Sequence, residues 1–229
     1  MHPNLENLVR VHEILHRLGV DVVYGGGATI GLYLDDFGAA KVRPTKDVDC
    51  IVPIEARPDY LALESTLRAA GLSPSTYEDD PLCRWVIDGV KVDILPLNEA
   101  ILGFTNRFYR VGFATAEAVE LPGGRRIKVL HPALAVATKI EAYRDRGASD
   151  PVASEDLEDI IALFDGCGGI VARIAEAPTA VQEAIGRWVR EFLGRRDALD
   201  LIEGHLGLGG SLRVARVVSL LEQAARGGV

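Results

Sequence analysis

Two aspartates separated by one hydrophobic residue are the side chains most suited to chemistry. Asp47-Val48-Asp49 opens the segment Asp47 to Val52, which the pattern predicts to be a strand. Successive side chains of a strand point to opposite faces, so Asp47 and Asp49 should share one face while Val48 and Cys50 cover the core. Two parallel carboxylates repel each other unless a cation lies between them, and Mg²⁺ prefers such oxygen ligands. The pair therefore indicates a metal site that handles phosphates.

A glycine-rich turn precedes these aspartates. Gly25, Gly26 and Gly27 follow a predicted strand, Asp21 to Tyr24, and precede a predicted helix, Ala28 to Phe37. Glycine permits positive φ and lets backbone N–H groups approach an anion at a helix N-terminus. A loop followed by a solvated strand end is the simpler alternative for either half alone. The turn and the carboxylates in this order favour chemistry on a nucleotide.

A third carboxylate follows in a predicted hairpin. Cys83 to Ile87 and Val90 to Ile94 flank Asp88-Gly89, a dipeptide that favours a two-residue turn. The predicted register opposes Ile87 with Val90, Trp85 with Val92, and Arg84 with Asp93.

This register places apolar residues on one face of the hairpin and Asp93 on the other. Asp93 then lies on a strand that can run beside the strand of Asp47 and Asp49. A surface ion pair between Arg84 and Asp93 is the simpler alternative. Arg84 could also offset the charge of the carboxylates until a metal binds.

Taken together, these segments resemble a known superfamily. Tyr24-Gly25-Gly26-Gly27-Ala28-Thr29, the spacer ending in Arg43-Pro44-Thr45-Lys46, and Asp47-Val48-Asp49 resemble the DNA polymerase β nucleotidyltransferases. The long spacer is most similar to the AbiEii-type enzymes, which include toxin components of toxin–antitoxin and phage-defence loci. By motif order the resemblance spans about Val20 to Phe164. The final helices carry no motif.

The resemblance implies an α/β (α+β) fold, in which a small mixed sheet forms the nucleotidyltransferase core and a helical C-terminal subdomain completes the site. The expected division is residues 1–130 and 131–229. Asp47, Asp49 and Asp93 would be the catalytic and metal-binding residues, holding two Mg²⁺ ions, with Mn²⁺ as a substitute. Asp93 would also be the candidate base.

The resemblance also implies a set of nucleotide-binding residues: Gly25, Gly26, Gly27, Thr45, Lys139, Arg146 and Asp159. Lys139, Tyr143 and Arg146 recur at helical spacing in a predicted helix, Pro132 to Arg146, so the three should share one face. A solvated lysine is the alternative for Lys139. Asp156 and Asp159 follow Ser154, and acidic residues after such a cap also stabilise a helix start. Glu155 stands where the family commonly has Lys, which departs from its pattern.

The function implied is transfer of a nucleoside monophosphate from an NTP, such as ATP, to an acceptor hydroxyl. The expected acceptor is RNA, such as tRNA, or protein, and an antitoxin would be the partner if the protein acts as a toxin. Two alternatives remain: a nucleotidyltransferase that modifies a small molecule such as an antibiotic, and a non-catalytic module that binds a nucleotide or a partner. The donor base and the oligomeric state are unreadable from the sequence.

Composition describes an ordinary globular chain. Of 229 residues, 48% are hydrophobic and 25% charged, and the net charge of −8 argues against coating nucleic acid through the overall field. Cys50, Cys83 and Cys167 are odd in number and widely spaced, which indicates neither a disulfide framework nor a zinc site. Cys50 and Cys83 fall at inward strand positions, which fits reduced core cysteines. The sequence shows neither a membrane-length apolar run nor a signal-peptide pattern, so we expect a cytoplasmic protein.

Further helices and a second hairpin complete the expected secondary structure. Helices are expected at Pro3 to Leu18, Arg57 to Ala70, Pro178 to Glu203, and Ser211 to Arg226. The second hairpin is expected to pair Arg110 to Leu121 with Arg125 to Leu130 around Pro122-Gly123-Gly124. Its outer strand would cover the edge of the sheet.

Overall fold

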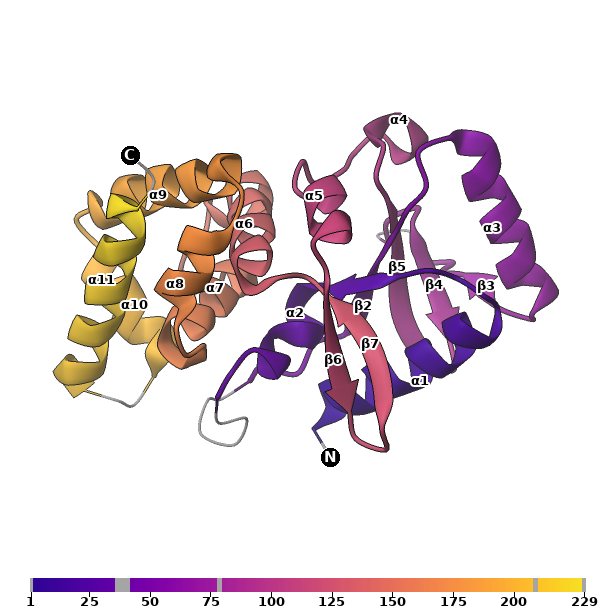
Figure 1. Ribbon diagram of the computed structural model, residues 1–229, viewed down its shortest axis with the longest axis horizontal. Coiled ribbons are helices and arrows are strands. Elements are labelled where there is room, and N and C mark those ends of the chain that lie inside the picture. Colours follow the sequence, from indigo (N-terminus) through magenta and orange to yellow (C-terminus); the bar gives the residue numbers. More distant parts are fainter. Residues whose placement is uncertain (1, 36–41, 78–79, 208–209, 228–229) are drawn as a thin grey trace. The chain divides into compact units, whose positions relative to one another are not determined.

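The chain forms two compact units in the computed structural model, which describes residues 2–35, 42–77, 80–207 and 210–227 (Figure 1). The first unit comprises Met1–Thr29 and Arg43–His131, and the second comprises Ile30–Val42 and Pro132–Val229. The division expected from the sequence, at residue 130, differs from this one in the segment 30–42. That segment groups with the C-terminal helices.

A seven-stranded mixed sheet is the frame of the first unit. Its spatial order is β3-β4-β5-β2-β1-β7-β6. The strands are β1 (Val23–Gly25), β2 (Asp47–Val52), β3 (Ser73–Pro74), β4 (Arg84–Ile87), β5 (Val90–Pro96), β6 (Glu117–Leu121) and β7 (Arg125–Val129). The pairs β2–β5 and β1–β7 are parallel, and the remaining pairs are antiparallel. The expected α/β class with a mixed sheet is confirmed.

The β4–β5 hairpin has the register that its turn predicts. Arg84 opposes Asp93, and Ile87 opposes Val90. Asp88 and Gly89 both have positive φ, 48° and 76°, as a type I′ turn requires. The apolar face of the hairpin is buried, with Trp85 fully enclosed, so the opposite face carries Arg84 and Asp93.

Besides the single turn of α2 (Gly26–Thr29), the described residues of the first unit form the helices α1 (Pro3–Arg17), α3 (Arg57–Ala69), α4 (Glu99–Leu102) and α5 (Tyr109–Ala114). The helices α1 and α3 match their predicted spans closely. α1 buries Leu8, Val11 and Leu15 at helical spacing. The Tyr60 hydroxyl of α3 donates to the carbonyl of Ile94 in β5 at 3.0 Å, which ties this helix to the sheet.

Two expectations for the first half of the chain are wrong. The helix predicted from Ala28 to Phe37 is one turn, α2 (Gly26–Thr29), followed by a 3₁₀ turn, η1 (Ile30–Leu32), while Phe37 lies outside the described residues. The Thr29 hydroxyl donates to the Gly26 carbonyl at 3.0 Å, and β-branched residues followed by glycine favour helices weakly.

The second hairpin is also shorter than predicted. Its residues before Glu117 form the helix α5 rather than a strand. The Asn106 side chain accepts from the Phe108 backbone N–H at 3.1 Å just before that helix, a local bond that competes with an extended chain. The outer strand, β6, does lie at the sheet edge as expected.

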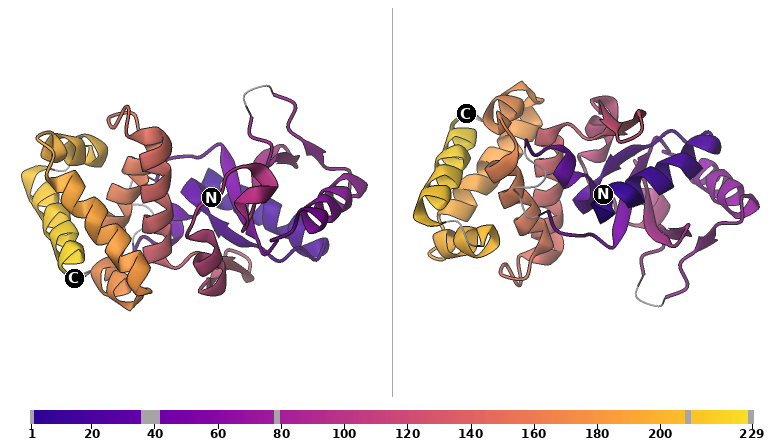
Figure 2. Two further views of the ribbon diagram at one scale, coloured as in Figure 1. Left: turned by 90° about the horizontal axis from the view of Figure 1, so that it is seen from above. Right: turned by 90° about the horizontal axis from the view of Figure 1, so that it is seen from below.

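The second unit is helical apart from its loops. Its helices are α6 (Pro132–Ala142), α7 (Glu155–Gly166), α8 (Ile170–Glu176), α9 (Thr179–Leu193), α10 (Ala198–Leu206) and α11 (Gly210–Arg226), seen from salmon to yellow in Figure 2. A π-helical turn, Tyr143–Gly147, extends α6. None of the helices in the described ranges has the length and apolar character needed to cross a bilayer.

The single helix predicted from Pro178 to Glu203 is wrong, because this stretch is divided between α9 and α10. Gly194 follows the last residue of α9, and glycine is a weak helix former. The Arg195 guanidinium binds the Asp197 carboxylate at 2.8 and 2.9 Å, which favours a local turn over a continuing helix.

Candidate active site

Three carboxylates lie on one face of the sheet, on its two central parallel strands. In the β2–β5 register, Asp49 stands opposite Asp93, and Asp47 lies two residues earlier on β2. Residues in register on neighbouring strands point to the same face, so the sheet itself groups the three side chains. This juxtaposition is the one that the sequence predicts for the metal-binding residues. The roles assigned to them stay predictions.

A guanidinium group lies among these carboxylates. Arg84 donates from Nε and Nη2 to the two oxygens of Asp93, each at 2.7 Å. Its Nη2 also donates to Asp47 Oδ2 at 2.6 Å, and its Nη1 donates to Asp80 Oδ1 at 2.9 Å. Arg84 therefore extends from β4 across β5 to β2, and its guanidinium group binds the carboxylates of Asp93, Asp47 and Asp80.

Asp80 is a site residue that the sequence reasoning missed. It accepts hydrogen bonds from Ser75 and Arg84, and from Lys91 at 3.0 Å. These donors lower the pKa of Asp80 to about 2, with Ser75 as the largest cause and Lys91 next. Asp80 lies four residues before Arg84 in a polar loop, and the sequence pattern of that loop gives no signal for the contact.

The glycine turn lies against the carboxylate of Asp49. Gly25 pairs with Asp49 in the β1–β2 register, and Gly26 has a φ of 66°. A Cβ on Gly26 would lie 2.0 Å from Asp49 Oδ2, so no larger residue fits without moving that carboxylate. The turn leads into α2, which is one helical turn long, so the helix dipole expected to favour phosphate is shorter than predicted.

Thr45 contacts Asp47 directly. Its hydroxyl donates to Asp47 Oδ1 at 3.0 Å, and its backbone N–H donates to the side chain of Asn4 at the same distance. Asn4, which is buried in α1, also donates to the Arg43 carbonyl at 3.0 Å. The segment that returns from the second unit is thereby fixed beside the carboxylates. Asn4 carries no motif, so the sequence does not reveal this role.

The carboxylate cluster fits divalent cations by the chemistry of its donors. Within the residues that the structure describes, no three His, Cys, Asp or Glu side chains form a ready metal cluster. Asp47 and Asp93 nevertheless direct oxygens at one shared cation, the Arg84 guanidinium. Hard carboxylate oxygens that already share a positive group are the ligand type that Mg²⁺ and Mn²⁺ prefer. Asp47, Asp49 and Asp93 are the residues that would hold such ions.

The electrostatics around the cluster keep Arg84 charged and the nearby thiols neutral. The hydrogen bond to Asp93 is the main cause that raises the pKa of Arg84 above its ordinary value. Burial raises the pKa of Cys83 to about 12 and also raises the pKa of Cys50 well above its ordinary value, with the carboxylates of Asp49 and Asp93 adding to both. All three cysteines are buried and lie outside disulfides, and the core positions expected for Cys50 and Cys83 are confirmed.

The remaining predicted nucleotide-binding residues lie in the second unit. Lys139 is buried and its Nζ lies 3.0 Å from Asp156 Oδ1 and 2.6 Å from Asp159 Oδ2. Arg146 binds Asp156 from Nε at 2.8 Å. Tyr143, the first residue of the π-helical turn, packs edge-on against Trp188 in α9. The shared face of Tyr143 with the two cations stays a prediction.

Comparison with known structures supports the fold. An antigenic nucleotidyltransferase-like protein from Paracoccidioides brasiliensis aligns with a TM-score of 0.52 and 19% sequence identity, over 88% of this chain and 93% of that chain. This similarity shows that the two chains share a fold.

Two structures of ANT(2'')-Ia are more distant. The solution structure of this antibiotic-resistance factor aligns with a TM-score of 0.44 and 14% identity, over 74% of this chain and 88% of that chain. The crystal structure with adenylyl-2''-tobramycin gives 0.45 and 15%, over 74% and 93%. Both similarities are too low to support an inference. No family model matches the sequence, and no curated protein matches it significantly.

Proposed function

We propose that this protein is a metal-dependent nucleotidyltransferase, which transfers a nucleoside monophosphate from an NTP to an acceptor hydroxyl. One observation carries the proposal: Asp47 and Asp93 converge on a single cation while Asp49 lies on the same face against the Gly26 turn. The fold shared with a nucleotidyltransferase-like protein supports it.

The three carboxylates would hold two Mg²⁺ ions. The chemistry that Mg²⁺ supplies in such a site is polarisation of the α-phosphate, activation of the acceptor hydroxyl and stabilisation of the pyrophosphate leaving group. Asp93 would accept the proton of the acceptor hydroxyl, since it is the carboxylate on the strand beside the aspartate pair. Gly25, Gly26, Gly27 and Thr45 would line the triphosphate side.

The finer assignments rest on the sequence resemblance. Lys139, Arg146 and Asp159 stay predicted nucleotide-binding residues, and their ion pairs in the second unit give them a structural role in addition. The acceptor is proposed to be RNA, such as tRNA, or protein, and a toxin role with an antitoxin partner is proposed from the AbiEii resemblance. The experiment below names the donor and the acceptor class.

The test is label transfer from each α-³²P-labelled NTP, with Mg²⁺ and either total tRNA or a cell lysate. We expect label in an RNA or protein band with the wild-type protein. In Asp49→Ala the label should fall by about two orders of magnitude or more, because one of the metal-binding carboxylates is lost.

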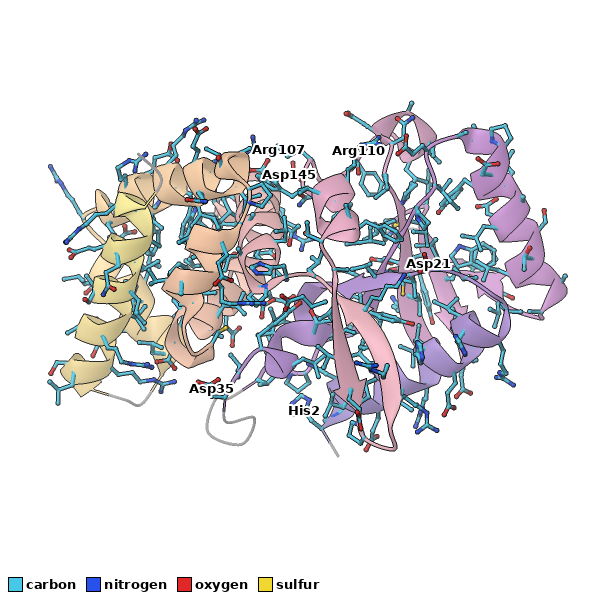
Figure 3. The ribbon with its side chains drawn as sticks, in the orientation of Figure 1. His2, Asp21, Asp35, Arg107, Arg110 and Asp145 are labelled. Atoms are coloured by element: carbon cyan, nitrogen blue, oxygen red, sulfur yellow. The ribbon has the colours of Figure 1, made fainter. Side chains whose placement is uncertain are left out.

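The matched variant Asp21→Ala removes an exposed carboxylate two residues before β1 (labelled in Figure 3), which pairs with Lys128. It should transfer label normally. Wild-type transfer by a folded Asp49→Ala protein would reject the assignment of the site. Label in neither RNA nor protein would shift the proposal to a small-molecule acceptor or to nucleotide binding alone, which nucleotide-dependent thermal stabilisation would separate.

A further inference from the structure

Arg84 occupies the oxygens that the proposed function needs for metal. Both oxygens of Asp93 accept from Arg84, and so does Oδ2 of Asp47. The second oxygen of Asp47 accepts from Thr45. A divalent cation at Asp47 and Asp93 would therefore meet a guanidinium already bound there, and two cations so close together repel each other.

We propose that Arg84 and the divalent metal bind Asp47 and Asp93 in turn, so that Arg84 is a built-in counterion which the metal must displace. This inference rests on the proposed function, because that function is the reason to expect metal at these residues. Arg84 is a positioning residue in this scheme. It holds Asp47 and Asp93 pointing toward a common centre before metal arrives.

The arrangement of the partners supports exchange rather than a fixed structural ion pair. The Arg84 side chain is 14% exposed, and that of Asp47 is 32% exposed, so solvent reaches the pair. Asp80 supplies a third carboxylate to Nη1 of Arg84 and is itself held by Lys91 and Ser75. When Asp47 and Asp93 release the guanidinium, Asp80 can keep it at the border of the site, so the released charge need not be stranded.

The exchange has a consequence for the order of binding. Because metal must compete with Arg84, the protein alone should bind Mg²⁺ weakly. A metal ion that arrives with a nucleotide brings phosphate oxygens as further ligands, which favours displacement of Arg84. Arg84 thereby couples occupation of the metal site to the presence of the nucleotide.

The test is direct Mn²⁺ binding, measured by electron paramagnetic resonance without nucleotide or acceptor. Arg84→Gln removes the competitor and should lower the Mn²⁺ dissociation constant by about tenfold or more. Its thermal midpoint without metal should fall below that of the wild-type protein, since Asp47 and Asp93 then repel each other, and Mn²⁺ should restore it. A purely structural ion pair predicts lower stability without tighter metal binding.

Two variants separate direct competition between Arg84 and Mn²⁺ from the general electrostatic effect of removing a positive charge. Lys91→Gln removes a positive charge of β5 that contacts Asp80 in the loop before β4, and should tighten Mn²⁺ binding by no more than about threefold. Arg110→Gln removes a guanidinium of α5 that pairs with Glu55 (Figure 3), and should leave the Mn²⁺ affinity unchanged. Equal tightening by Arg84→Gln and Lys91→Gln would overturn the proposal, and so would unchanged or weaker binding in Arg84→Gln.

A measurement on the wild-type protein covers the case in which Arg84→Gln does not fold. The Nε–H nuclear magnetic resonance signal of Arg84, assigned with Arg84→Lys, should shift when Mg²⁺ and a non-hydrolysable NTP analogue are added together. A signal unchanged at concentrations that saturate the site would overturn the exchange. If Arg84→Gln tightens Mn²⁺ binding as expected but the wild-type protein transfers no label, the proposed function is rejected and this inference stands.

Discussion

Gly26 has two separate reasons to be glycine. Its φ of 66° lies in the left-handed region, and a Cβ there would overlap the carboxylate of Asp49. The turn therefore does more than approach an anion: it fixes the space in which Asp49 lies. This requirement for close approach links the glycine motif to the aspartate motif in physical terms.

Gly26→Ala should destabilise the protein by about 1–2 kcal/mol from the backbone alone, and should also displace Asp49. We therefore expect a lower thermal midpoint together with weaker Mn²⁺ binding and slower label transfer. Thermal unfolding and Mn²⁺ titration of the purified variant measure the two effects.

Gly27→Ala is the matched control, because Gly27 has ordinary φ and a Cβ there would come no closer than 3.2 Å, to the flexible end of Arg43. Its stability should stay within about 0.5 kcal/mol of the wild-type protein. An equal loss of stability in Gly26→Ala and Gly27→Ala would show that the turn tolerates no side chain at either position. The contact of Gly26 with Asp49 would then have no special effect.

Elements whose register is set locally were predictable, and elements set by distant partners were not. Asp88-Gly89 fixed the β4–β5 register, including Arg84 opposite Asp93, because a two-residue turn leaves one pairing. The contact of Arg84 with Asp47 depends on the parallel pairing of β2 with β5, which nothing near either strand specifies. Asp80 was missed although it lies only four residues before Arg84, because its polar loop carries no periodic pattern. The helix expected from Ala28 ended early through the local bond of Thr29.

Lys139 links α6 to α7 through its ion pairs, and its replacement should lower the stability of the second unit. Lys139→Met leaves Asp156 and Asp159 buried without their lysine, so we expect a loss of about 3–5 kcal/mol in the free energy of unfolding. Urea denaturation followed by the fluorescence of Trp188, which lies in α9 of the same unit, measures the change.

Arg144→Met serves as the comparison, since Arg144 pairs with the exposed Glu191 and should cost less than about 1 kcal/mol. If Lys139→Met is as stable as Arg144→Met, the buried network contributes little, and Lys139 would be better explained by ligand binding alone.

At the scale of the whole molecule, the second unit depends on two acidic residues of one helix. Burial alone would raise the pKa of Asp156, but Arg146 and Lys139 outweigh it and lower the pKa. Asp165 behaves alike, because Arg213 and Arg216 of α11 overcome its burial. Both carboxylates therefore stabilise the folded unit in their charged form.

Stability of the second unit should be constant near neutral pH and fall below about pH 4. Stability falls with decreasing pH because both carboxylates have lower pKa values in the folded protein than in the unfolded chain. The unfolded chain takes up protons first, so stability is lost as the pH drops through the pKa values of the folded protein. Hydrogen exchange of α7 amides across an acid series measures this. Arg213→Gln should reduce the acid dependence, and a unit that gains stability between pH 5 and pH 3 would contradict the assignment.

The grouping of Ile30–Val42 with the C-terminal helices has a consequence for how the chain is connected. Gly166 and Gly168 leave room for Leu34 and Asp35, whose side chains lie where a Cβ on either glycine would be, and the Asp35 N–H donates to the Gly166 carbonyl at 3.1 Å. The polypeptide thus leaves the first unit, contributes a short segment to the second, and returns. A cut at residue 131 would separate the later helices from a piece of their own packing. Each unit is built from two separate segments of the sequence, so recombination at a single breakpoint cannot transfer either unit whole.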